Sequence, residues 1–236
     1  MELLEGMDLQ SMVKEHGPLP EARAVHLLVQ VCHSLEEAHS VGLVHRDIKP
    51  ANLFVGKAGR AYDFVKVLDF GLVKLEEAAP VSSDGPLTDA GTVVGTPGYM
   101  APELTVGGEA TPRSDLYALG CVAYFVLTGR LVFEGRGPLQ QLFAHAHEEP
   151  DPVSKWAPVG EALAAVVMRC LAKDPSERPS SAAALAAALR AAVPADGWTD
   201  EDARRFWAER PSRAAAAPSS ESAAVAPTAP RGRVAR

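Results

Sequence analysis

The stretch "LVHRDIKPANLFV", residues 43–55, places a group of polar side chains between two apolar ends. Asp47 is a candidate base, Asn52 offers a neutral amide oxygen on the same tight loop, and Asp69 follows after the next β-rich stretch. A carboxylate and an amide oxygen, with no His or Cys companion, suit a hard cation such as Mg²⁺ that also takes phosphate oxygens. Lys49 can reach the same space and would neutralise charge on a phosphoryl group. The stretch therefore predicts phosphoryl transfer.

The surrounding sequence predicts an α+β fold that is mainly α-helical. Upstream, apolar residues recur every three or four positions over residues 20–40, with a proline at the start, which predicts an amphipathic helix. Downstream, "NLFVGK" and "FVKVLDFG" predict two short strands in a hairpin. Residues 72–94 predict a long functional loop. The remaining body is predicted to be helical: a central buried helix over 114–129 closed by Gly129, and helices around 138–147, 160–172 and 180–193.

The C-terminal part divides into two segments. "GWTDEDARRFWAER" has a threonine N-cap followed by acids and two aromatic residues, so we expect an accessory helix within residues 194–210 that docks on the body. Residues 211–236 are rich in Ala, Pro and Ser and have no aromatic residue, which predicts a disordered tail. The main domain is therefore expected to cover residues 1–193.

Composition narrows the class of protein. The net charge is −7 with scattered basic residues, so no nucleic-acid partner is expected. No apolar stretch is long enough to span a bilayer, and the N-terminus is acidic, so we expect a cytoplasmic protein without a membrane span.

Cys32, Cys121 and Cys170 each lie in an apolar run without C-x-x-C spacing, which predicts reduced core residues. His145 and His147, at i and i+2 on a helix, make a poor metal pair and are expected to be solvated.

Three motifs occur in the order of the protein-kinase signature: "HRDIKPAN" at 45–52, Asp69-Phe70-Gly71, and Ala101-Pro102-Glu103. Together with "GTVVGTPGYMAPE" and "DPSERP", they make residues 1–193 resemble the large, C-terminal lobe of bacterial Ser/Thr kinases of the eukaryotic type. The resemblance implies a kinase-like C-terminal lobe in which short strands bear the catalytic loop. It also implies ATP and Mg²⁺ as cofactors and Ser/Thr hydroxyls of proteins as acceptors.

The resemblance also implies a role for each matching residue. Asp47 would orient the substrate hydroxyl and accept its proton, Lys49 would contact the γ-phosphate, and Thr96 would bond to both. Asn52 and Asp69 would hold Mg²⁺. Structural or adenine-contacting roles are implied for the hinge residues from Glu2 to Leu4, the pocket floor Phe54, the motif residues His45, Arg46, Phe70 and Gly71, the pair Glu103 and Arg178, and the loop anchor Asp115.

Phosphorylation is expected in the loop 72–94. Thr88 and Thr92 are the main candidate sites, because a phosphate there could pair with Arg46. Ser82 and Ser83 are weaker candidates.

The Gly-rich loop and lysine with which the small lobe of the family clamps ATP do not occur in these residues. We therefore expect an N-terminally truncated kinase with negligible activity by itself. We also expect an exposed apolar face that includes Phe54 and Phe70 and could support kinase–kinase association. The alternative is a catalytically silent binding or regulatory module.

Overall fold

A computed structural model describes residues 5–70, 96–195 and 197–209. Its sheet has three antiparallel strands in the order β1 (Gly6–Asp8), β2 (Leu53–Ala58) and β3 (Ala61–Val67). The predicted hairpin is confirmed as β2–β3, although β3 begins at Ala61, before the expected stretch. The sequence did not predict β1, because a strand of 3 residues is too short to show an alternating pattern.

Helices make up most of the described chain, so the predicted fold class is confirmed. The predicted helix at 20–40 is α2 (Glu21–Ser40), with Pro20 at its N-cap. The predicted central helix is α4 (Pro112–Thr128), which ends at Gly129 in the left-handed conformation with φ 72°. The other α-helices are α1 (Leu9–His16), α3 (Pro102–Thr105), α5 (Pro138–His147), α6 (Glu161–Cys170), α7 (Ala182–Ala191) and α8 (Asp200–Ala208). Single 3-10 turns form η1 (Pro50–Asn52), η2 (Pro97–Tyr99), η3 (Val153–Lys155) and η4 (Pro175–Glu177).

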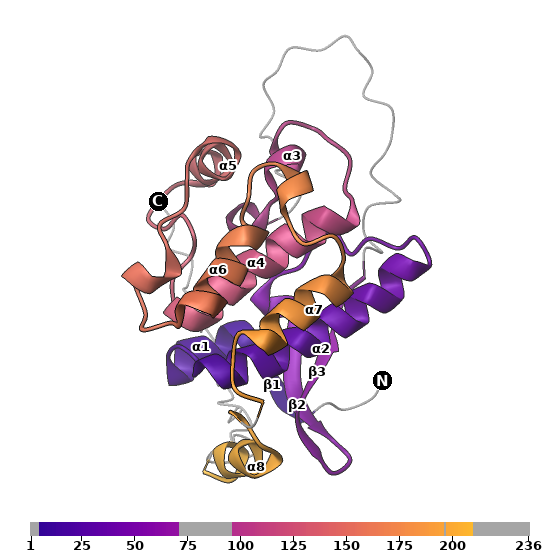
Figure 1. Ribbon diagram of the computed structural model, residues 1–236, viewed down its shortest axis with the longest axis vertical. Coiled ribbons are helices and arrows are strands. Elements are labelled where there is room, and N and C mark those ends of the chain that lie inside the picture. The colour runs from indigo at the N-terminus through magenta and orange to yellow at the C-terminus, as the bar shows by residue number, and fades with distance from the viewer. Residues whose placement is uncertain (1–4, 71–95, 196, 210–236) are drawn as a thin grey trace, which may run out of the picture.

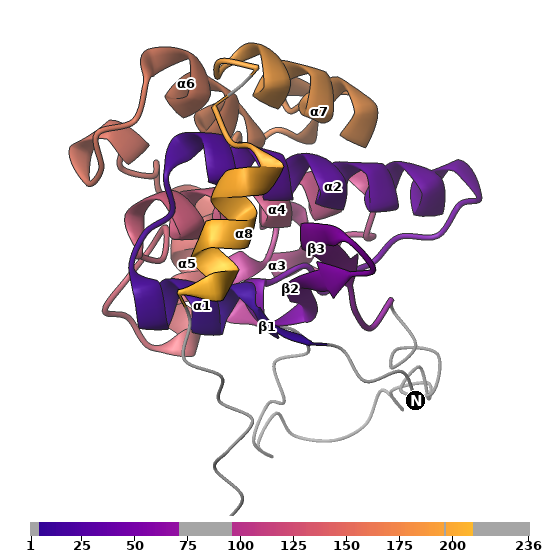
Figure 2. The ribbon, with the colours of Figure 1, turned by 90° about the horizontal axis from the view of Figure 1, so that it is seen from below.

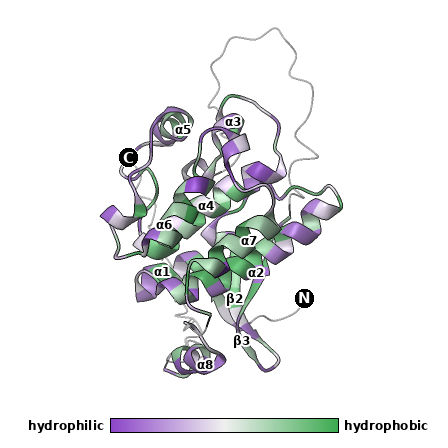
Figure 3. Cartoon of the chain, viewed as in Figure 1, coloured by the Kyte–Doolittle hydropathy of each residue, from purple (hydrophilic) through white to green (hydrophobic). Residues whose placement is uncertain are grey.

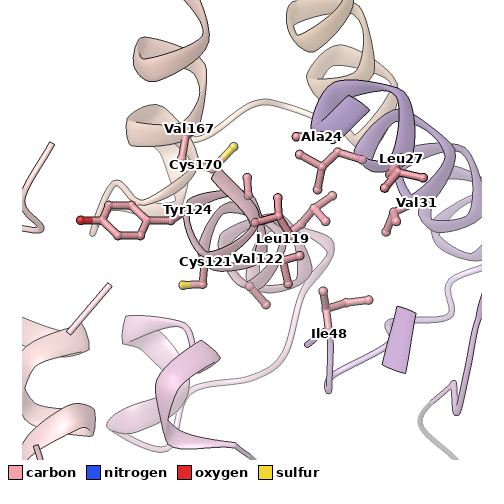
Figure 4. Packing of buried hydrophobic residues seen from close by; sticks show 14 of the residues in the cluster. Ala24, Leu27, Val31, Ile48, Leu119, Cys121, Val122, Tyr124, Val167 and Cys170 are labelled. Carbon is pink, nitrogen blue, oxygen red and sulfur yellow. The ribbon is translucent and has the colours of Figure 1, made fainter. Parts of the chain in front are cut away.

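These elements stack in layers. Figure 2 shows α6 and α7 on one side, α2 and α4 in the middle, and α1 with the sheet on the other side. Hydrophobic residues concentrate in the central helices α2 and α4 (Figure 3). Their side chains meet in one core: Leu27 and Val31 of α2 pack near Leu119 and Val122 of α4 and Ile48 of the opening stretch (Figure 4). Ile48 thus anchors the residues that follow His45 on the core.

The predicted burial of the three cysteines is confirmed. Cys32, Cys121 and Cys170 are free thiols, each at most 2% exposed, in α2, α4 and α6 respectively. Burial raises the pKa of all three thiols, that of Cys170 to about 12. They are inert core residues rather than nucleophiles.

Two sequence expectations about exposure were wrong. His145 is fully buried, not solvated, and its Nδ1 lies 2.8 Å from the hydroxyl oxygen of Tyr117, whereas His147 is exposed. Phe54 and Phe70 are half-buried and are not among the strongly exposed large apolar side chains of the described residues, such as Val41 and Phe143. Association through the face of Phe54 and Phe70 stays a prediction.

None of the described helices combines the length and hydrophobicity needed to cross a membrane.

Candidate active site

Asp115, near the start of α4, holds the backbone of the opening stretch. Its Oδ2 accepts the backbone N–H of His45 at 2.8 Å, and its Oδ1 accepts that of Arg46 at 2.9 Å. His39, in the last turn of α2, places its Nε2 2.8 Å from the same carboxylate. Arg46 has φ 71°, a left-handed conformation that is costly for a residue with a Cβ. The two backbone bonds to Asp115 hold the turn in that conformation.

His45 joins the loop to the residues that follow β3. Its ring is fully buried, and its Nδ1 accepts the backbone N–H of Asp47 at 3.3 Å. Its Nε2 therefore carries the proton and donates to the carbonyl of Leu68 at 2.9 Å. The ring of Phe70 lies against the imidazole with centroids 4.6 Å apart. Asp47 and Asp69 are thus positioned by one shared side chain.

Four predicted catalytic residues converge. Lys49 Nζ donates to Asp47 Oδ2 at 2.6 Å and to Thr96 Oγ1 at 3.2 Å. Asn52 Nδ2 donates to the backbone oxygen of Asp47 at 2.8 Å and to its Oδ2 at 3.1 Å. Thr96 Oγ1 lies 3.5 Å from Asp47 Oδ1. The Asp47 side chain is 37% exposed, so its carboxylate is fixed by protein donors and still accessible to a substrate.

Asn52 and Asp69 lie at the same edge of the hairpin. The residue before Asp69, Leu68, donates its backbone N–H to the backbone oxygen of Asn52 at 2.8 Å. Asn52 uses its amide nitrogen on Asp47, and its amide oxygen is the kind of neutral oxygen that a hard cation binds. Asp69 has an exposed side chain and φ 56°. Two hard oxygen donors beside an open edge fit Mg²⁺, which keeps several waters and takes phosphate oxygens as its other ligands.

A hollow of about 340 Å³ opens beside Asp47. Its wall includes Arg46 and Asp47 of the loop, Thr96 and Tyr99 around η2, and Leu104 of α3. Because the carboxylate of Asp47 borders this hollow, a hydroxyl-bearing chain seated there would place its oxygen near a fixed acceptor.

Glu103 and Arg178 form the predicted ion pair, at the base of this wall. Arg178 donates from both terminal nitrogens to the two Glu103 oxygens, each at 2.8 Å, and Ser114 Oγ donates to Glu103 Oε1 at 2.7 Å. Burial acts to raise the pKa of Glu103, but the hydrogen bonds from Arg178 and Ser114 outweigh it and hold the pKa below the ordinary value. The charged pair fixes α3, and with it the loop that leads from Thr96.

The sequence that carries this site matches a known protein family. The protein kinase domain family matches residues 1–189 of the chain. The chain belongs to the protein kinase family. Among curated kinases, Pkn1 of Myxococcus xanthus is 45% identical over 194 residues, and pkn3 of the same organism is 41% identical over 189 residues. Both are named serine/threonine-protein kinases. The matches cover 82% and 78% of this chain but only 27% and 34% of those proteins, so the chain spans a minor part of the relatives' length.

Solved kinase structures share the fold. The PknI kinase domain of Mycobacterium tuberculosis aligns with a TM-score of 0.60 at 26% identity, over 82% of this chain and 65% of that one. A structure of Rad53 in complex with AMP-PNP aligns with a TM-score of 0.62 at 28% identity, over 79% of this chain and 44% of that one. The kinase-like arrangement predicted from the motifs is therefore confirmed at the level of the fold.

Several predicted site residues lie outside the described part of the chain: Glu2, Leu4, Gly71, Thr88 and Thr92, together with Ser82 and Ser83. Sequence reasoning missed Ser114 and His39, which complete the hydrogen bonding of Glu103 and Asp115. Only Ser114 could have been noticed in the sequence, because it stands three residues after Thr111, as the second residue of a capping box does. Nothing local to His39 indicates its partner, which lies 76 residues away.

Proposed function

We propose that the chain is the large lobe of a cytoplasmic serine/threonine protein kinase, which transfers the γ-phosphate of ATP to Ser/Thr hydroxyls of proteins. The observation that carries the proposal is the convergence of Lys49, Asn52 and Thr96 on Asp47. A silent binding module would not need three polar side chains aimed at one accessible carboxylate, so the enzyme is the better-supported candidate.

Each residue has a definite task in this proposal. Asp47 orients the attacking hydroxyl and takes its proton, because it is the exposed acceptor beside the hollow. Lys49 lies 2.6 Å from Asp47 and would balance the negative charge of the transferred group. Thr96 bonds to Lys49 and keeps its ammonium beside the carboxylate. Asn52 and Asp69 would hold Mg²⁺, which when bound neutralises charge on the phosphates.

Residues 1–236 on their own are proposed to be almost inactive. The Gly-rich loop and lysine that clamp the phosphates in this family do not occur in these residues. The exposed Asp69 would therefore hold a nucleotide at an open, wet edge, where electrostatic stabilisation of the transition state is weak.

The test is a chimera that adds the small lobe of a family member such as Pkn1 of Myxococcus xanthus ahead of Met1. With radiolabelled ATP, Mg²⁺ and a Ser/Thr peptide library, the chimera should transfer phosphate, whereas residues 1–236 alone should not. Asp47→Asn should reduce transfer by about 100-fold or more. The control, Asp151→Asn, changes an exposed carboxylate paired with Lys155 and should have no effect. A folded chimera without Asp47-dependent transfer would contradict the proposal.

A further inference from the structure

One buried carboxylate outside the active site receives an unusual number of donors. Asp63, on β3, is 0% exposed and has φ 52°. Arg23 of α2 donates to both of its oxygens, from Nε at 2.9 Å and from a terminal nitrogen at 2.8 Å. Two indole N–H groups complete the set: Trp198 donates to Oδ2 at 3.0 Å and Trp207 to Oδ1 at 2.7 Å. Half of the side-chain donors to this carboxylate therefore come from the C-terminal segment.

The guanidinium of Arg23, which pairs with Asp63, is covered by the same C-terminal segment. The Arg23 guanidinium lies 3.5 Å from the ring centroid of Phe206 and 5.0 Å from that of Trp198, and Arg23 is only 2% exposed. Aromatic faces attract a guanidinium most strongly when water is excluded. The ion pair between α2 and β3 is thus completed and closed off from water by residues 198–207.

The segment also contacts α1. Phe206 meets His16, the last residue of α1, with ring centroids 5.0 Å apart and planes at 73°. Figure 2 shows α8 passing from the start of α2 to α1. At the other end, Gly197 crosses α2 so closely that a Cβ there would lie 2.7 Å from the Cβ of Ala22, a separation that requires glycine. One short segment therefore touches α1, α2 and β3.

We infer that residues 197–208 form a strap that binds the Arg23–Asp63 pair and holds α1, α2 and β3 together as one unit. The folded unit thus continues beyond the family match, which ends at residue 189. Two of the three elements adjoin the residues proposed to hold Mg²⁺: α1 packs against η1, which ends at Asn52, and β3 ends two residues before Asp69. Release of the strap would therefore loosen both elements.

The test uses the full chain and hydrogen–deuterium exchange read by mass spectrometry. Trp198→Phe with Trp207→Phe keeps two aromatic rings but removes both indole donors. Exchange should accelerate about 10-fold in α8, in α1 and in β3, and the midpoint of thermal unfolding should fall by about 5 °C. Exchange in α5 should not change, because α5 packs against α3 and η2 and lies at the opposite end of the molecule from α8 (Figure 1).

The chain offers a matched control in its third tryptophan. Trp156 lies over Arg130 at 4.2 Å, in a different part of the body, so Trp156→Phe makes the same chemical change and should leave α1 and β3 protected. Acceleration confined to α8, or none at all, would overturn the inference. If the double variant does not fold, Trp207→Phe alone removes one donor and should accelerate the same three segments to a smaller degree. An effect of that single change on α8 alone would also overturn the inference.

Discussion

His145 shows how a single side chain can make stability depend on pH. The ring packs edge-to-face on Phe133 and Tyr117, and Nδ1 pairs with the Tyr117 hydroxyl. Burial, together with the nearby Lys173 ammonium, lowers the pKa of His145 from 6.5 to about 4, and the backbone of Gly98 opposes the shift only in part. Because the folded chain accommodates the neutral imidazole, protonation of His145 at low pH destabilises the folded state.

The sign of the effect follows from linkage. Between pH 6.5 and about 4 the unfolded chain binds a proton at His145 that the folded chain does not. The free energy of unfolding should therefore fall as pH falls through this window, by roughly 3 kcal/mol in total from this group. His145→Gln should lose that part of the pH dependence. Urea unfolding of both chains at pH 7 and pH 4.5 measures it, and equal slopes with pH would contradict the assignment.

The sequence predicted the helix that contains His145 but not the burial of its side chain. The helix 138–147 is confirmed as α5, because its apolar spacing and its initial proline are local signals. The burial of His145 depends on Tyr117, 28 residues earlier in α4, and no pattern within α5 reveals that contact. The motif residues around Asp47 were located more fully, since their order along the chain is itself informative.

At the scale of elements, α4 does more than fill the core. Its Asp115 is 2% exposed and accepts the backbone N–H groups of His45 and Arg46 while it contacts His39. The buried carboxylate of Asp115 thus links the core to the loop that carries Asp47. The long apolar run over residues 114–129 predicted this helix, but the anchoring role of Asp115 came only from resemblance, because an acid in the first helical turn is otherwise an ordinary feature.

Asp115→Ala should therefore damage both stability and the loop. Two backbone donors would lose their buried acceptor, at a cost of about 3 kcal/mol in the free energy of unfolding. Arg46 should also leave its φ of 71°, since the bonds from His45 and Arg46 to Asp115 help to hold that strained turn. Urea unfolding measures the first effect, and protease cleavage after Arg46 reports the second. Asp151→Ala, at an exposed i,i+4 pair with Lys155, is the control and should change stability by less than about 0.5 kcal/mol.

At the scale of the whole molecule, three helices from distant parts of the sequence share one core (Figure 4). Local sequence patterns located α2, α4 and α6 separately, but they could not say which of these helices touch, because packing partners are set by the topology of the chain. The C-terminal region illustrates the same limit: its cap and aromatic residues predicted a docked helix, whereas its binding site at Arg23 and Asp63 became visible only in three dimensions.

The three buried cysteines allow the opening of this core to be measured as a rate of thiol labelling. Each thiol belongs to a different helix, and each is at most 2% exposed with a raised pKa. A thiol-specific dye can therefore react with a cysteine only after the helices around it separate. We expect Cys32, Cys121 and Cys170 to label at one common rate that rises steeply with urea. A cysteine that labels quickly without urea would show that its helix detaches separately from the other two.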